Sequence, residues 1–259
     1  MAPIAVDLDR GWLITADAGP TLRARPAADG RPGDQDMTTW AGLLPVYAAF
    51  QRGLTGMVDD LLAAGVPDER PSRYAAMLAE LVADERIWTR VDIADRRRTD
   101  AARRRLSDLE PLVAALASTL SASAVPAAID HGDLHGNNVV PAADGAFRLF
   151  DWGDAVVAHP FATLTTTLGS IGHHAGVDPY GPAVADVRDA YLSAWADIAP
   201  APDIERVATL AMDLGHIGKA AAWERALMGL EPDEMAGFHG ACAAWLADFA
   251  DRLDDRAHA

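Results

Sequence analysis

One short stretch of this chain constrains its fold more than any other. Residues 131–138 read His-Gly-Asp-Leu-His-Gly-Asn-Asn, so the carboxylate of Asp133 lies five positions before the carboxamide of Asn138. A short, mostly apolar run at 147–150 then leads directly into a second carboxylate, Asp151. Polar groups at fixed spacing need rigid flanks to hold their geometry. We therefore expect a short strand at 127–131 and a hairpin formed by 138–140 and 147–150 around the Asp-Gly turn at 144–145.

The residue types at these positions suit phosphoryl transfer. A carboxylate such as Asp133 can orient an acceptor hydroxyl and take its proton as the new bond to phosphorus forms. Asn138 and Asp151 offer the hard oxygen atoms that Mg²⁺ prefers, and one or two protein ligands suffice because this ion keeps waters and phosphate oxygens. His131 would pack beneath the loop and fix its backbone by hydrogen bonds.

Other interpretations of the same residues stay open. His131 and His135 are four positions apart, but they lie in a glycine-containing loop without an obvious third ligand, so a zinc site is disfavoured. A single aspartate after a strand is usually a turn or cap residue. Asp154 fits an ordinary cap as well as it fits a contact with substrate or Mg²⁺.

The rest of the chain predicts a mostly helical α+β protein. Two short apolar runs within 4–16, separated by an Asp/Gly turn, predict a hairpin, and the Gly-, Pro- and Asp-rich segment 17–37 predicts a loop and linker. We expect a small N-terminal part at 1–37 and a helical body at 38–259. Apolar residues at three- and four-residue spacing predict helices over about 38–64, 71–84, 100–120 (with a possible break at Pro111), 160–172, 183–197, 203–229 and 233–254.

Composition narrows the classes of partner. The formal net charge of −16 argues against nucleic acid, which calls for a basic surface. It suits a cationic substrate drawn into an acidic cleft, although acidity also simply favours solubility. Cys242 is the only cysteine and lies in an apolar stretch, so no internal disulfide framework is expected. No signal peptide and no apolar stretch of eighteen residues is evident, so we expect a cytoplasmic protein without a membrane span.

The combination of these motifs resembles a known family. His-Gly-Asp-x-His-x-x-Asn, a hairpin, and then an apolar strand with Asp-Trp-Gly-Asp-Ala is similar to the aminoglycoside phosphotransferase family of kinase-like enzymes. Residues 11–19 look like the last N-lobe strands and hinge of that family, and 40–51 like its first C-lobe helix. His159-Pro160-Phe161 looks like the segment after the metal-binding aspartate. The resemblance covers nearly the whole chain.

The resemblance implies both a fold and an activity. The fold would be a protein-kinase-like C-lobe with a residual N-lobe hairpin and hinge. The activity would be transfer of the ATP γ-phosphoryl group to a hydroxyl of a small molecule, an aminoglycoside being the name-giving acceptor of the family. The implied cofactors are ATP and Mg²⁺, with adenine meeting Leu13, Ile14 and Thr15 at the hinge.

The same resemblance assigns the roles of the loop residues. Asp133 would be the catalytic base, His131 a structural residue of the catalytic loop, and Asn138 and Asp151 the Mg²⁺ ligands. The competing hypothesis is a truncated or degenerate kinase-like protein that binds a ligand or partner without catalysis.

The chain also departs from the kinase-like pattern. It contains no Gly-x-Gly-x-x-Gly, and no lysine precedes the loop. Its only lysine, Lys219, is expected to be a surface or capping residue of a C-terminal helix. Three explanations fit: a fragment or a wrong start site, a degenerate relative, or a site completed by another chain. The first is favoured, because the loop residues look undamaged.

Overall fold

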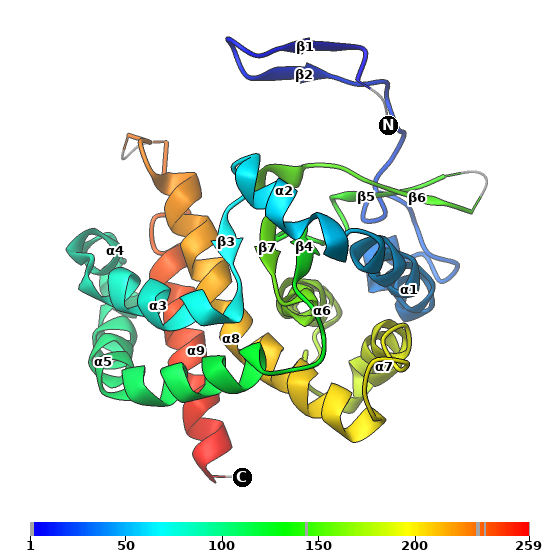
Figure 1. The fold of residues 1–259 in the computed structure, drawn as a ribbon. Coiled ribbons are helices and arrows are strands. Elements are labelled where there is room, and N and C mark those ends of the chain that lie inside the picture. The colour runs from blue at the N-terminus through cyan, green and yellow to red at the C-terminus, as the bar shows by residue number, and fades with distance from the viewer. Residues whose placement is uncertain (1–2, 143–144, 232–233, 236, 259) are drawn as a thin grey trace.

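The protein is a mostly helical α+β structure, described by the computed structural model at residues 3–142, 145–231, 234–235 and 237–258. Helices surround a small central sheet, and a hairpin extends from one end of the body (Figure 1). The helices are α1 (Met37–Gly53), α2 (Val58–Ala63), α3 (Tyr74–Ala83), α4 (Glu85–Thr89), α5 (Ile93–Ser121), α6 (Thr163–Ala175), α7 (Ala185–Ser193), α8 (Ala201–Leu227) and α9 (Ala241–His258). The strands are β1 (Ala5–Asp7), β2 (Trp12–Ile14), β3 (Asp68–Glu69), β4 (Ala128–Asp130), β5 (Val139–Pro141), β6 (Phe147–Leu149) and β7 (Val156–Ala158).

Helix α1 shows how local chemistry sets the element boundaries. The carboxylate of Asp36 caps its N-terminus by accepting hydrogen bonds from the Thr38 amide at 3.0 Å and the Thr39 hydroxyl at 2.7 Å. The helix ends at Gly53, a residue with low helix propensity, and α2 begins only at Val58. The prediction of one helix over 38–64 is therefore wrong.

Helix α5 is longer than the sequence predicts. It runs without a break from Ile93 to Ser121, so the expected interruption at Pro111 is wrong. Pro111 is exposed, which lets water satisfy the carbonyl that loses its helical hydrogen bond. The extra N-terminal turns carry Arg98, whose guanidinium lies 2.6 Å from carboxylate oxygens of both Asp248 and Asp251 on α9.

The strands form three small sheets rather than one. In the central sheet β7 lies between β3 and β4, parallel to the first and antiparallel to the second. All three residues of β4 are buried, and this strand leads directly into the 131–138 loop. β5 and β6 form the predicted hairpin, with Val139 paired to Leu149; its expected turn residue at position 144 lies outside the described residues.

Buried polar side chains of α1 form hydrogen bonds with β4 and with the residue that follows it. The hydroxyl of Tyr47 accepts a hydrogen bond from the His131 amide at 2.8 Å and donates to Asp130 at 3.2 Å. Gln51 donates to the carbonyl of Ile129 at 2.9 Å, and its own amide oxygen accepts from Tyr191 of α7 at 2.6 Å. Because buried polar groups must be paired, this network fixes the strand from which the loop starts.

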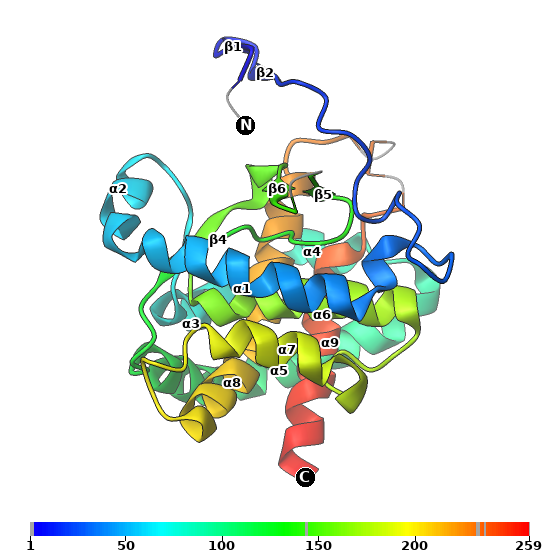
Figure 2. The same cartoon turned by 90° about the vertical axis from the view of Figure 1, so that its right-hand side faces the viewer.

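The N-terminal hairpin stands apart from this body. β1 and β2 pair antiparallel, as the sequence predicts, with Ala5 opposite Ile14. Both views show the pair beyond the end of the helical part (Figures 1 and 2). Its apolar side chains are largely exposed, with 63% of Trp12 and 63% of Leu13 accessible to solvent. None of the helices in the described ranges is long and apolar enough to cross a membrane.

A buried ion pair between α8 and α9 yields a test of this packing. Asp213 is fully buried, and its carboxylate oxygens lie 3.3 Å from Arg252 and 2.5 Å from Arg256. We expect Asp213→Asn to lower the free energy of unfolding by about 2–4 kcal/mol, because two guanidinium groups lose their counter-charge. Asp203→Asn on the same helix removes an exposed carboxylate and should cost under about 1 kcal/mol. Similar urea midpoints for the two variants would contradict this assignment.

Candidate active site

The loop that follows β4 is held from below by His131. Its ring is fully buried, with Nε2 2.9 Å from the carbonyl of Phe150 and Nδ1 accepting a hydrogen bond from the Asp133 amide at 3.4 Å. Thr167 of α6 donates to the carbonyl of Leu134 at 2.9 Å. The His131 ring thus connects the backbone of the loop at Asp133 with the backbone of Phe150, the residue before Asp151.

The carboxylate of Asp133 is the centre of the site. Its Oδ1 lies 2.5 Å from Nζ of Lys219, and its Oδ2 lies 3.0 Å from Nε2 of His135. Burial raises the pKa of this carboxyl, but the hydrogen bond from His135 and the charge of Lys219 outweigh burial and hold the pKa well below its usual value. Asp133 is therefore ionised at neutral pH and keeps a quarter of its side-chain surface accessible.

Asn138 is fixed directly against Asp133. Its Nδ2 donates to the Asp133 carbonyl at 2.9 Å and to Oδ2 of the carboxylate at 3.3 Å. This orientation leaves the carboxamide oxygen as the atom available to a cation. An amide oxygen of this kind, together with a nearby carboxylate, fits the hard-oxygen preference of Mg²⁺.

Asp151 lies at the same end of the β5–β6 hairpin as Asn138. The amide of Phe150 donates to the Asn138 carbonyl at 3.3 Å, which brings the residue before Asp151 opposite Asn138. Asp151 has φ 61° and ψ 63°, the one left-handed backbone conformation among the non-glycine residues that the structure describes. Such a conformation costs about 1–2 kcal/mol and tends to occur where function demands it.

Lys219 corrects a prediction, because it is neither a surface nor a capping residue. Only 9% of it is exposed, and it reaches the loop from the middle of α8. Two glycines of α8 lie close to neighbouring elements beside this site. An added Cβ at Gly215 would lie 2.3 Å from Thr165 Oγ1 of α6, and one at Gly218 would lie 2.6 Å from Glu69 Oε2 of β3. A lone lysine within an otherwise apolar helix segment was the sequence signal for this contact.

Further charged groups surround Lys219. Asp154 Oδ2 lies 3.9 Å from its Nζ, and six residues further along the helix Arg225 pairs with Glu69 at 2.6 Å. These side chains line a cavity of about 20 Å³ beneath the loop, enough for about one water. Sequence patterns did not identify Glu69 or Arg225 as site residues. Glu69 lies on a strand of only two residues, and such a strand leaves no periodic pattern in the sequence.

The segment before α1 also touches the loop. The Leu22 amide donates to the Val139 carbonyl at 2.7 Å, and the Arg23 amide donates to the Gly136 carbonyl at 3.0 Å. The buried carboxylate of Asp34 lies against Gly136, where an added Cβ would meet the Asp34 side chain at 2.3 Å. The predicted loop over 17–37 is thus partly fastened to the site.

The predicted adenine-binding residues are not brought to this loop. Leu13 and Ile14 belong to β2, and with Thr15 they are exposed on the hairpin that stands apart from the body. Within the described ranges, no group of three or more His, Cys, Asp or Glu side chains is arranged to hold a metal ion. The residues that the structure gathers are Asp133, His131 and Asn138, with Asp151 across the hairpin.

Comparison with known proteins identifies the family. A family model described as the phosphotransferase enzyme family (APH) matches residues 13–210, most of the chain. This chain belongs to the APH phosphotransferase family. No curated protein matches it. The matched residues include the whole APH loop and hairpin but end before Lys219 and Arg225, so the family match does not extend to these two cations.

Gly132 gives a first test of the site geometry in this APH protein. Its φ is +73°, and an added Cβ would lie 2.2 Å from the carbonyl oxygen of Asp154. Gly176 is the matched control, because its φ is +68° with nothing within 4 Å. We expect Gly176→Ala to cost about 1–2 kcal/mol through backbone strain. Gly132→Ala should cost about 1–3 kcal/mol more through overpacking. Equal losses in urea unfolding would show that the close approach to Asp154 is wrong.

Glu69 gives a pH-dependent test. Burial raises the pKa of its carboxyl to about 7, against the opposing charge of Arg225. A pKa raised on folding contributes stability that is fully present below the unfolded value of 4.5 and is lost as pH rises through 7. Glu69→Gln cannot titrate, so its free energy of unfolding relative to wild type should rise by about 3 kcal/mol between pH 4.5 and 8.

The control for Glu69 is Glu80→Gln, which removes an exposed carboxylate from α3. Its stability should follow the wild-type pH curve in urea unfolding. A Glu69→Gln curve parallel to wild type would contradict the assignment of a protonated buried carboxyl.

Proposed function

We propose that this protein transfers the γ-phosphoryl group of ATP to a hydroxyl of a small, amine-bearing molecule. The observation that carries the proposal is the geometry around Asp133. Asn138 is hydrogen-bonded to this carboxylate, His131 holds the loop beneath it, and Asp151 follows the paired hairpin strand. A base and two hard-oxygen ligands are groups that phosphoryl transfer uses, and the short strands beside them restrict their movement.

Each residue has a role in this scheme. Asp133 orients the acceptor hydroxyl and takes its proton. Asn138 and Asp151 would hold Mg²⁺, which neutralises phosphate charge when bound. Adenine would meet Leu13, Ile14 and Thr15. The corresponding domain organisation is a kinase-like C-lobe at 38–259, preceded by the last hairpin and hinge of an N-lobe at 1–37.

A second cavity supports an amine-bearing acceptor. It has a volume of about 300 Å³, lies between β3, α3 and α8, and shares Glu69 and Arg225 with the small cavity beneath Lys219. Five acidic side chains and one guanidinium line it. The acidic side chains belong to Asp68, Glu69, Glu80, Asp84 and Glu224, and burial raises the pKa of Glu69 to about 7.

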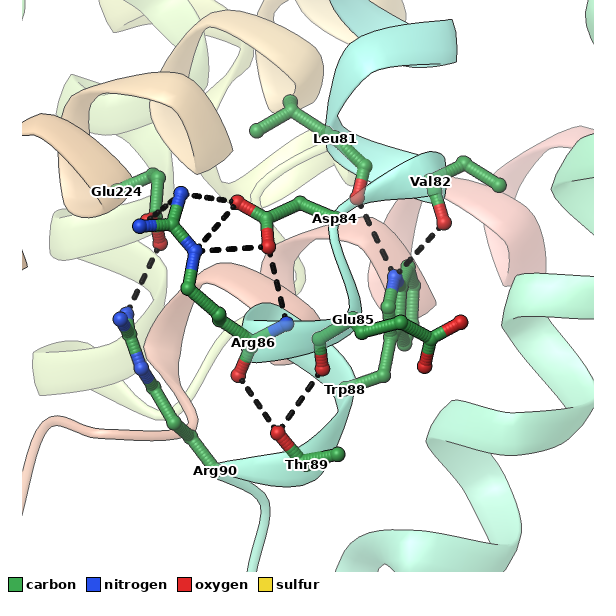
Figure 3. Close-up of polar contacts among 9 residues, drawn as sticks. All are labelled: Leu81, Val82, Asp84, Glu85, Arg86, Trp88, Thr89, Arg90 and Glu224. Carbon is green, nitrogen blue, oxygen red and sulfur yellow. Dashed lines mark hydrogen bonds and ion pairs between the residues drawn. The ribbon is translucent and has the colours of Figure 1, made fainter.

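Arginines pair with four of the five acidic side chains of this cavity. Arg70 lies 2.7 Å from Asp68, and Arg225 lies 2.6 Å from Glu69. Figure 3 shows the other two pairs, Asp84 with Arg86 and Glu224 with Arg90 at 3.2 Å. Glu80 is exposed and has no ion-pair partner among the described residues. This carboxylate and the net charge of −16 favour a cationic ligand.

The competing function is ligand binding without turnover. It is favoured by one observation: both carboxylate oxygens of Asp133 already have cationic or histidine partners, Lys219 and His135. A carboxylate so stabilised is a weak base. A protein of this kind would gain thermal stability from its ligand without releasing ADP.

One assay distinguishes phosphoryl transfer from ligand binding without turnover. With ATP, Mg²⁺ and a panel of aminoglycosides and amino alcohols, wild type should release ADP only when an acceptor is present. Asp133→Asn should lower kcat by roughly two to four orders of magnitude. It should still fold cooperatively, with a lower melting temperature, because the buried ammonium of Lys219 loses its carboxylate partner. Asp186→Asn, an exposed aspartate of α7, should keep wild-type activity. Undiminished turnover in Asp133→Asn would exclude Asp133 as the base, and a ligand-stabilised wild type without ADP release would favour pure binding.

A further inference from the structure

Lys219 is a buried cation that the family match does not cover. It comes from 86 residues downstream of Asp133, and it is the only lysine of the chain. Its Nζ lies 2.5 Å from Asp133 Oδ1, 3.3 Å from the Gly132 carbonyl and 3.9 Å from Asp154 Oδ2. Two of the three ammonium donors thus have hydrogen-bond acceptors, and the Asp154 carboxylate lies just beyond hydrogen-bond distance.

Two glycines of α8 lie close to Lys219 in the sequence. Gly215 and Gly218 precede Lys219 on α8. An added Cβ at Gly215 would meet Thr165 of α6, and one at Gly218 would meet the carboxylate end of the Glu69 side chain. A glycine in a helix interior costs about 1 kcal/mol relative to alanine, so two of them weaken α8. Gly215 thus lets α8 lie close to α6, the helix that also holds the loop through Thr167.

The Nζ atom of Lys219 lies close to where the reacting hydroxyl and phosphorus would be. A base must lie within about 3 Å of the acceptor hydroxyl, and that hydroxyl lies about 3–3.5 Å from the phosphorus it attacks. Nζ contacts the same carboxylate oxygen that would accept the hydroxyl proton. Lys219 carries this ammonium on a flexible four-carbon stem, so a change in its torsions would shift Nζ from Asp133 towards a phosphoryl group that arrives beside this carboxylate.

We propose that Lys219 is a catalytic residue, an inference that rests on the proposed function. Its ammonium would leave Asp133 and bind the transferring phosphoryl group. Its ammonium neutralises the Asp133 carboxylate until the phosphoryl group arrives and then contacts that group. The exchange frees Asp133 Oδ1 to accept the acceptor hydroxyl. It supplies a lysine ammonium from α8, downstream of the loop.

The chemical step balances without any further reactant. The acceptor oxygen forms a bond to the γ-phosphorus, the bond from that phosphorus to the β–γ bridging oxygen breaks, and ADP leaves. The hydroxyl proton goes to Asp133. Lys219 keeps its proton throughout and only changes hydrogen-bond partners, which stabilises the charge on the phosphoryl oxygens.

Nucleotide binding tests this exchange without turnover. Dissociation constants of ATP and ADP, each with Mg²⁺, would be measured by calorimetry for wild type, Lys219→Met, Lys219→Arg, Asp133→Asn and the Lys219→Met, Asp133→Asn double variant. Asp133→Asn should bind ATP about tenfold more tightly, because the ammonium no longer has a competing carboxylate. ADP, which lacks the γ-phosphoryl group, should bind almost as in wild type.

The lysine variants should show the opposite pattern. Lys219→Met should reduce the preference for ATP over ADP about tenfold, and Lys219→Arg should restore part of it. The double variant should lose the tightening seen in Asp133→Asn. Arg206→Met removes an exposed cation from the same helix and should leave both affinities unchanged.

The outcomes distinguish this inference from the proposed function. If ATP does not bind more tightly to Asp133→Asn, or if Lys219→Met weakens ATP and ADP equally, Lys219 has only a structural role. If folded wild type binds neither nucleotide, the proposed function fails. In that case inorganic pyrophosphate is titrated instead, and tightening in Asp133→Asn that vanishes in the double variant supports Lys219 as an anion-binding residue, whereas its absence overturns this role.

Should Lys219→Met fail to fold, Lys219→Arg and Asp133→Asn still decide the question. Both keep a polar group at the buried position, and thermal unfolding reports their integrity. Loss of the ATP preference in a folded Lys219→Arg, together with no tightening in Asp133→Asn, would overturn the exchange.

Discussion

The contact between Lys219 and Asp133 ties the two parts of this structure together. Asp133 lies on a loop held by β4, β5 and α6, whereas Lys219 belongs to the long helix α8 that packs against α9. Neither charge could stay buried alone, because an unpaired buried charge is costly. The loop and the approach of α8 therefore depend on one another.

Around this pair, the loop is held by contacts from both directions of the chain. Tyr47 of α1 and His131 fix its start, and Arg23 in the segment before α1 binds its far end at Gly136. Such bracing suits a site that must position groups within a fraction of an ångström. The strained backbone of Asp151 fits the same interpretation, since strain persists only where surrounding contacts enforce it.

Short-range features of the fold could be predicted from the sequence. The β1–β2 and β5–β6 hairpins and strand β4 are encoded in a few consecutive residues around turns, and the structure has them where expected. The predictions of one helix from 38 to 64 and of a break at Pro111 were wrong. The apolar periodicity continues across the short turn between Gly53 and Val58, and an exposed proline can be tolerated within a helix.

The surroundings of Asp133 could be predicted only in part. Its neighbours in sequence, His131 and Asn138, follow from the motif, but Lys219 reaches it through tertiary packing. The local pattern held a clue, since Lys219 lies in the stretch Leu214–Trp223 among glycine, alanine and isoleucine, where a charged side chain needs a buried partner. Which partner it finds depends on how α8 crosses the loop, and no local pattern encodes that crossing.

Transfer to an acceptor is tested most directly with ATP whose γ-phosphoryl oxygens are labelled with ¹⁸O, using mass spectrometry of the acceptor. Phosphoryl transfer predicts a phosphorylated acceptor that carries the three labelled non-bridging oxygens and keeps its own hydroxyl oxygen. Labelled inorganic phosphate with an unmodified acceptor, or intact ATP beside a ligand-stabilised protein, would contradict a phosphotransferase built on Asp133, Asn138 and Asp151.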